Sequence, residues 1–247
     1  MARRNFNPGT LTAPLPPVMA TVGDMENSNI ITIGWTGILA SDPPRTYISV
    51  RPQRHSHGML KKGMEFVINL PTVSLAKEVD YVGIFTGAKV DKFKECRLTK
   101  KESLKVSPPT IAECPVALEC KVYEVVSMGT HDVFMADIVS VSCDESIIDE
   151  KGRIQFDKAD LLAYAHGEYF ALGEKVGRFG FSADKKNTAA KRNATAEKKL
   201  KGATEEKKEG KKAKNATPDK EKKRPFYVDA PRGKGQKKAK SRGGKRK

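Results

Sequence analysis

Cysteine, histidine and long apolar runs are all scarce in this 247-residue chain, and each scarcity argues against a class of protein. The four cysteines, at positions 96, 114, 120 and 143, form no Cys-x-x-Cys pair, and no histidine pair follows at zinc-finger spacing. A structural metal site is therefore not expected, and such irregular cysteines are typical of reduced thiols in a cytoplasmic protein. No apolar stretch suits a signal peptide or a membrane span, so we expect a cytoplasmic protein without membrane attachment.

The chain also lacks the glycine motif of dinucleotide-binding folds. No Gly-x-Gly-x-x-Gly follows a strand candidate, and the glycines between 173 and 180 have a different spacing. Many β-rich runs with only short helical stretches between them argue against a doubly wound parallel sheet. The sequence therefore predicts a mainly β protein built as an antiparallel barrel, which closes on itself to remove exposed strand edges.

Charge divides the chain into two parts. Lys and Arg total 46 against 30 Asp and Glu, and residues 184–247 hold 25 of the basic and 8 of the acidic residues. That segment carries a formal charge of +17, whereas the preceding residues carry −1. It has few apolar residues to offset the entropy cost of ordering. We expect a folded domain over residues 10–182 and a disordered Lys-rich tail over residues 183–247.

β-Branched runs separated by turn residues predict the strands. A long hairpin is expected over 116–126 and 133–141, with its turn around Gly129. Four shorter strands are expected near 18–22, 30–33, 46–50 and 66–68.

Three short helices are expected between the strands. Ser56 is a suitable N-cap for a helix over 57–62 that ends before Gly63. Apolar residues at helical spacing predict a second helix over 75–82, and residues 157–165 suggest a third. Residues 167–181, which are punctuated by glycine, are expected to be irregular.

The segment after the strand near 46–50 is the clearest candidate for binding chemistry. Arg51 and Arg54 immediately precede the helix that begins near Ser56. A helix start attracts anions, and guanidinium groups bind phosphate with paired hydrogen bonds. The same residues are also compatible with a surface loop that carries two solvated arginines.

The order of the short motifs resembles the flavin reductase-like, FMN-binding split-barrel family, and its flavoredoxin-type branch in particular. The motifs include Asn29-Ile-Ile-Thr-Ile-Gly-Trp, Ile48-Ser-Val-Arg, Glu65-Phe-Val-Ile-Asn-Leu-Pro, Asp80-Tyr-Val-Gly-Ile-Phe-Thr-Gly, Gly129-Thr-His-Asp and Gly167-Glu-Tyr-Phe. They occur in the expected order across residues 10–182. The resemblance implies a split β-barrel, a homodimer and an FMN site at the dimer interface.

The resemblance and the charge pattern together nominate residues for the cofactor. Arg51, Arg54 and Ser56 are expected to meet the phosphate, and the segment 29–36 is expected to border the ring system. The full set of expected FMN-binding residues is Asn29, Thr32, Gly34, Trp35, Thr36, Ser49, Arg51, Arg54, His55, Ser56, Asn69, Thr86, Gly87 and His131. Tyr169 and His166 are candidates for the pocket border. Tyr169 could instead be a packed aromatic residue, and Trp35 could equally belong to the core.

Two further alternatives stay open at this point. His55 and His57 could share a face of an extended segment, although without a third ligand a capping or phosphate-side role fits them better than a metal. The basic tail could attach to nucleic acid through counterion release, or it could be only a solubilising segment.

For function, the resemblance implies an oxidoreductase in which FMN performs the electron chemistry. The electron donor is expected to be NADH or NADPH or a redox partner protein. Whether FMN is a prosthetic group or a substrate is open. The alternative function is a nucleic-acid-associated protein that uses its tail, with the barrel as a scaffold.

Overall fold

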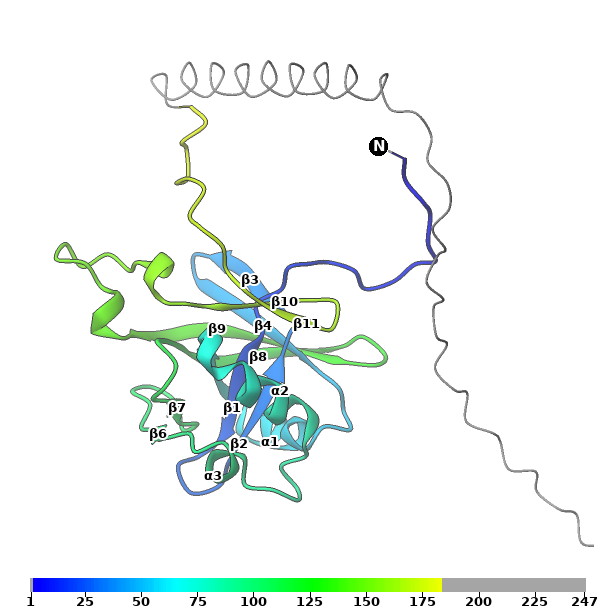
Figure 1. The fold of residues 1–247 in the computed structure, drawn as a ribbon. Coiled ribbons are helices and arrows are strands. Elements are labelled where there is room, and N and C mark those ends of the chain that lie inside the picture. The colour runs from blue at the N-terminus through cyan, green and yellow to red at the C-terminus, as the bar shows by residue number, and fades with distance from the viewer. Residues whose placement is uncertain (1, 184–247) are drawn as a thin grey trace, which may run out of the picture. The chain divides into compact units, whose positions relative to one another are not determined.

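Seven antiparallel strands form the main sheet in a computed structural model that describes residues 2–183 (Figure 1). Their spatial order is β2-β1-β5-β8-β9-β4-β3. Their bounds are Val18–Gly23 for β1, Ser28–Ile33 for β2, Thr36–Ser41 for β3, Pro44–Val50 for β4, Glu65–Leu70 for β5, Val116–Ser127 for β8 and Asp132–Cys143 for β9. Every pairing between neighbours in this sheet is antiparallel.

Short helices and two small hairpins complete the fold. The α-helices are α1 (His55–Gly63), α2 (Ala76–Ile84) and α3 (Lys92–Glu95), and 3-10 turns lie at η1 (Val73–Leu75), η2 (Glu145–Ile147) and η3 (Phe156–Lys158). Strands β6 (Lys100–Lys101) and β7 (Thr110–Ile111) pair with each other, as do β10 (Leu162–Ala165) and β11 (Glu168–Ala171).

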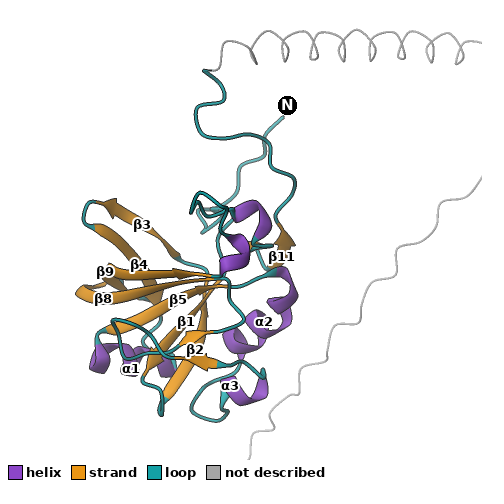
Figure 2. Ribbon diagram, turned by 90° about the vertical axis from the view of Figure 1, so that its left-hand side faces the viewer, coloured by secondary structure: helices purple, strands orange, loops and turns teal. Residues whose placement is uncertain are grey.

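Strands β1 and β2 are covered on both faces, which explains why their sequences are almost continuously apolar. Alternate residues such as Val18 and Ala20 pack with Leu60 of α1 in one core cluster. Met19 and Ile30 point the other way and pack with the α2 residue Val79 in a second cluster. Because successive side chains of a strand point to opposite faces, this burial requires apolar residues at nearly every position. Figure 2 shows α1 and α2 on opposite sides of these strands.

The barrel is split between β2 and β4. These two strands approach each other but are not neighbours in the hydrogen-bonded order of the sheet. A backbone hydrogen bond from Ser49 N to Trp35 O, 3.0 Å long, links the end of β4 to the residue pair that follows β2. The seam between β2 and β4 therefore brings the ends of two strands together without a continuous ladder.

Most of the predicted elements are confirmed. The hairpin β8–β9, the strands β1, β2, β4 and β5 and the helix α2 all form within a few residues of their predicted bounds. All four cysteines are free thiols, as predicted. The predicted fold, an antiparallel split barrel with short helices, is the fold observed.

Four local predictions are wrong. Ser56 is not the N-cap of α1, because the helix begins at His55 and Ser56 lies buried inside its first turn. The helix continues through Gly63, and Met64 ends it in the left-handed conformation with φ 54°. Residues 157–165 form a 3-10 turn and the strand β10 in place of a helix, and β11 lies within the segment predicted to be irregular. Pairing between β10 and β11 outweighs the weak helical pattern.

The chain divides into two units, Met1–Val176 and Gly177–Lys247. The first unit holds every element above. Of the second unit, residues 177–183 are described, and residues 179–182 form turns. The predicted disorder of the tail and the predicted nucleic-acid contact through it concern residues from 184 onward, which lie outside the described residues.

Candidate functional site

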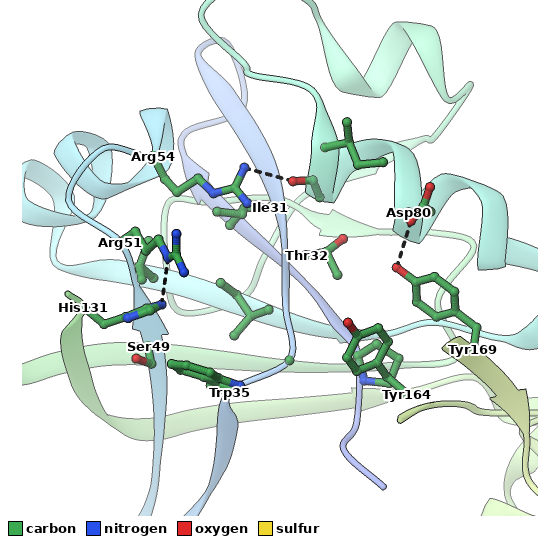
Figure 3. Close-up of a pocket in the computed structure, with 16 residues that line it drawn as sticks. Ile31, Thr32, Trp35, Ser49, Arg51, Arg54, Asp80, His131, Tyr164 and Tyr169 are labelled. Carbon is green, nitrogen blue, oxygen red and sulfur yellow. Dashed lines mark hydrogen bonds between the residues drawn. The ribbon is translucent and has the colours of Figure 1, made fainter. Parts of the chain in front are cut away.

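A cavity of about 470 Å³ opens at the seam between β2 and β4 (Figure 3). Ile31 to Trp35 supply one wall, and Ser49 to Arg51 supply the facing wall. The walls mix apolar, aromatic and basic groups. The full lining is Pro17, Ile31, Thr32, Ile33, Gly34, Trp35, Ser49, Val50, Arg51, Arg54, Asp80, Gly83, Ile84, His131, Tyr164 and Tyr169.

A smaller cavity of about 100 Å³ adjoins the first, and the two share Ile31 and Arg54. The start of α1 forms one side of it. Its lining contains no carboxylate and consists of Asn29, Ile31, Gln53, Arg54, His55, Ser56, Phe85, Thr86, Gly87 and Lys92. No acidic side chain lies in the first turn of α1. The start of a helix carries a partial positive charge, so this lining without carboxylates favours an anion over a cation.

Asn29, Ser56 and Gly87 are packed tightly in the smaller cavity. Asn29 donates a hydrogen bond from Nδ2 to Ser56 Oγ over 2.8 Å, which ties β2 to the start of α1. A Cβ atom at position 87 would lie 2.2 Å from Asn29 Oδ1, far closer than packed atoms allow. Only glycine therefore fits at position 87 without displacing Asn29.

Lys92 adds a buried positive charge to the smaller cavity. Its side chain, only 4% exposed, donates from Nζ to the carbonyl oxygens of Ile30 and Val82 over 2.7 and 2.8 Å. Burial, with a further contribution from Arg54, lowers the pKa of Lys92 from 10.5 to about 8. An anion bound beside Lys92 would favour its charged form.

Trp35, His131 and Arg51 form a cluster on the wall of the larger cavity. The rings of Trp35 and His131 lie 4.6 Å apart between centroids, and Arg51 Nε approaches His131 Nε2 at 3.4 Å. Partial burial and the neighbouring Arg51 lower the pKa of His131, so the imidazole is neutral at physiological pH. Trp35 is 39% exposed and lines the cavity, so it is not a core residue.

A buried His–Asp pair supports the turn that carries His131. His57 Nε2 lies 2.8 Å from Asp132 Oδ2, and the Lys61 ammonium lies 3.6 Å from the same oxygen. Hydrogen bonds from His57 and Ser127 hold the pKa of Asp132 below its usual value. The pair joins α1 to the start of β9, next to His131. His57 therefore has a structural role that needs no metal.

Asp80 and Tyr169 lie on one side of the larger cavity, and Arg51 lies on the other (Figure 3). The Tyr169 hydroxyl donates to Asp80 Oδ1 over 3.3 Å. Burial and the nearby carboxylate raise the pKa of Tyr169 to about 12, so the phenol stays protonated. Tyr164 packs edge-on against Tyr169 with 5.3 Å between ring centroids.

Twelve of the fourteen predicted residues line one or both cavities. The larger cavity takes Thr32, Gly34, Trp35, Ser49, Arg51, Arg54 and His131, and the smaller takes Asn29, Arg54, His55, Ser56, Thr86 and Gly87. Their roles in binding stay predictions. Arg51 lines only the larger cavity, whereas Arg54 lines both.

The two remaining residues line neither cavity. Asn69 is fully buried, donates to Met19 O over 3.0 Å and accepts from Ile111 N over 2.9 Å. Thr36 donates to Tyr47 O over 2.6 Å and so fastens β3 to β4. Both side chains stabilise the barrel through backbone contacts.

Sequence reasoning missed Lys92, Asp80 and Tyr164. Lys92 lies in a charged segment, where one more lysine gives no local sign that it is buried. The three-residue period that places Asp80 and Gly83 on one face of α2 could have indicated that Asp80 faces the cavity.

Within residues 2–183, no three His, Cys, Asp or Glu side chains come together as metal ligands. None of the helices in that range has the length and apolar character needed to cross a bilayer.

Comparison with known proteins defines the class. A solved structure of flavoredoxin from Desulfovibrio vulgaris (Miyazaki F) is 29% identical, covers 74% of this chain and 100% of its own, and has a TM-score of 0.69. The FMN-binding protein from Thermus thermophilus with bound 1-cyclohex-2-enone is 27% identical over 72% of this chain and 99% of its own, with a TM-score of 0.60. An uncharacterized protein of Archaeoglobus fulgidus is 34% identical over 135 residues, which are 55% of this chain and 76% of the relative.

The fold and the seam cavity thus place the chain among the split-barrel proteins. The family model described as the flavin reductase like domain matches residues 11–173. The chain belongs to the flavin reductase-like family, as its motifs predicted.

Proposed function

We propose that this protein is an FMN-binding oxidoreductase that passes electrons between a donor and the flavin. The observation that carries the proposal is the joining of two unlike cavities through Arg54 and Ile31. One is small and cationic, and the other is larger, with apolar and aromatic walls. FMN likewise joins a phosphate group to an apolar ring system through a short chain.

The smaller cavity suits the phosphate of FMN. Arg54, Lys92 and the start of α1 supply positive charge, and Ser56 and Thr86 supply hydroxyl groups. Gly87 leaves room for the side chain of Asn29, which donates to Ser56 at the start of α1. A single phosphate fits this donor set without any carboxylate to repel it.

The larger cavity suits the ring system. Ile31, Ile33 and Val50 offer apolar contact, while Trp35 and the neutral His131 offer ring faces. Thr32 is held in place by a hydrogen bond from its hydroxyl to the Val79 carbonyl. When bound, FMN supplies the electron chemistry, and these residues bind it, orient it and exclude water.

FMN uptake by the purified protein tests the proposal. We expect absorbance and fluorescence titration to give about one FMN per chain, with the cofactor seated against Trp35. A protein that takes up neither FMN nor FAD would overturn the proposal. Tighter binding of FAD than of FMN would support a flavin site but identify its cofactor as FAD.

The electron donor and the assembly are part of the same proposal. We propose NADH or NADPH, or a redox protein, as the donor, in a cytoplasmic homodimer. Support for a dimer comes from β3, an edge strand on which Ile38 and Leu39 are 69% and 46% exposed. A monomeric mass in light scattering, unchanged by Ile38→Lys, would contradict the dimer.

A further inference from the structure

The C-terminal end of α2 is held by two cations from other parts of the chain. The last carbonyl groups of a helix have no partner within the helix, and the last turn of α2 carries no basic side chain. Lys92 Nζ, at the start of α3, donates to Val82 O over 2.8 Å. Arg54 Nη1 donates to Gly83 O over 2.9 Å (Figure 3). Lys92 and Arg54 therefore cap α2, and positive charge is stabilising at this end of a helix.

Lys92 and Arg54, which we call the cation clamp, also line the smaller cavity. Phe85, Thr86 and Gly87, which directly follow α2, line the same cavity. The side chains that hold the end of α2 are therefore cations that an anion in this cavity would meet.

Each cation keeps N–H groups for an anion while it holds α2. An ammonium group has three N–H groups and a guanidinium group has five. Within residues 2–183, Lys92 uses two on the carbonyl oxygens of Ile30 and Val82, and the Arg54 side chain uses one on Gly83 O. Burial is the main cause of the lowered pKa of Lys92, and the Arg54 charge adds to it, so the two cations repel each other. An anion that both cations contact would offset this repulsion and strengthen their hold on α2.

The end of α2 that the clamp holds is also a wall of the larger cavity. Asp80, Gly83 and Ile84 line that cavity. Ile84 is 64% exposed and Phe85 is 46% exposed, and the ring of Phe85 stacks on Tyr81 of the same helix. Because the last residues of α2 bury little apolar surface, the hydrogen bonds from the clamp are important for the local stability of this wall.

We propose that the clamp responds to an anion: a phosphate group in the smaller cavity stabilises the last turn of α2 and residues 85–87. It thereby fixes the wall that Asp80 and Ile84 give to the larger cavity. Arg54 and Lys92 are positioning residues in this respect, because they act on the larger cavity through α2. The inference rests on the proposed function for the identity of the anion, which is then the phosphate of FMN.

Amide hydrogen exchange in the full-length protein tests the clamp, because the exchange rate of an amide in α2 reports how often this end of the helix opens. The amides of residues 82–84 are followed, since in a helix they donate to carbonyl groups of α2 itself. Inorganic phosphate alone should slow their exchange, and FMN should slow it about tenfold. Riboflavin, which has the ring system without the phosphate, should leave their exchange almost unchanged.

Variants separate the clamp from direct contact with the ligand. In Lys92→Met and in Arg54→Gln, FMN at a concentration that saturates each variant should slow exchange only about threefold, because one cation remains. Arg54 is exposed, so its replacement leaves the core intact even if Lys92→Met folds poorly. Lys121→Met is the matched control, because it removes an exposed lysine that pairs with Glu65 in the sheet. The control should respond to FMN as the wild type does.

Three results would overturn the inference. These are no effect of inorganic phosphate on residues 82–84, protection by riboflavin equal to that by FMN, or full protection by FMN in both clamp variants. FMN uptake without an effect of phosphate would leave the proposed function standing and remove the clamp. Protection by phosphate in a protein that takes up no FMN would refute the proposed function and keep the clamp.

Discussion

Asn29 donates from Nδ2 to Ser56 Oγ over 2.8 Å, and this buried hydrogen bond joins the first residues of β2 to the first turn of α1. The contact fixes the position of a helix start relative to the barrel. Ser56 Oγ accepts this hydrogen bond, and no side chain caps the start of α1.

Gly87→Ala should weaken FMN binding about tenfold, because the new Cβ would lie 2.2 Å from Asn29 Oδ1 and displace the Asn29–Ser56 pair. Fluorescence titration measures the change. Gly58→Ala is the matched control, since position 58 lies in α1 with nothing within 4 Å of the added atom. The control should bind FMN normally and be slightly more stable, because alanine favours helix. Equal FMN affinity in both variants would refute the packing argument.

FMN affinity should fall as pH rises through about 8, the pKa of Lys92 in the folded protein. Below that pH the ammonium is charged and attracts the phosphate, and above it the attraction is lost. FMN titrations from about pH 7 to about pH 10 measure this, in a range where the phosphate stays doubly charged. Lys92→Met should bind FMN more weakly than the wild type, with an affinity that does not change with pH. A wild-type affinity that does not vary across this range would contradict the assignment.

Lys92 should give the stability of the apoprotein the opposite pH dependence, so that its contribution to stability rises with pH. The folded pKa lies below the unfolded value of 10.5, so the unfolded chain holds more protons between about pH 8 and 10.5. The contribution of Lys92 to stability therefore rises with pH across that window. The difference in the free energy of unfolding between the wild type and Lys92→Met, measured with denaturant at each pH, isolates this contribution. A difference that falls as pH rises would count against it.

Asp132→Asn should lower the melting temperature at neutral pH, because it removes the charged partner of the buried His57. The pKa of Asp132 is lowered in the fold, so its stabilising effect exists above the ordinary value and disappears as pH falls through the lowered one. Thermal unfolding at neutral and strongly acid pH measures the difference between the two proteins. That difference should shrink in acid, and a constant difference would show that the charge does not matter.

The barrel could be predicted because its strands differ from their surroundings in composition. Val18–Val22 and Ile30–Ile33 are apolar at nearly every position, since α1 and α2 cover their two faces. The edge strand β3 escaped prediction, because Ile38 and Leu39 are exposed and its residues show no buried alternation.

The site could be predicted only in part. The order of the motifs pointed to residues of β2 and of the start of α1, because these short motifs follow one another along the chain as they do in the family. It did not separate Arg51 from Arg54, since the direction of a long side chain depends on neighbours such as His131 and Gly83, which are distant in sequence. The burial of Lys92 likewise depends on the carbonyl groups of Ile30 and Val82, which no local pattern reveals.

The most direct test of the proposed cofactor site is one titration. FMN is added to the wild type and to Arg54→Gln while the fluorescence of Trp35, the only tryptophan in the chain, is followed. We expect quenching that saturates at about one FMN per wild-type chain, and an affinity about tenfold or more weaker in the variant. Saturable binding with equal affinity in both proteins, or no quenching in either, would contradict the placement of the flavin at the β2–β4 seam.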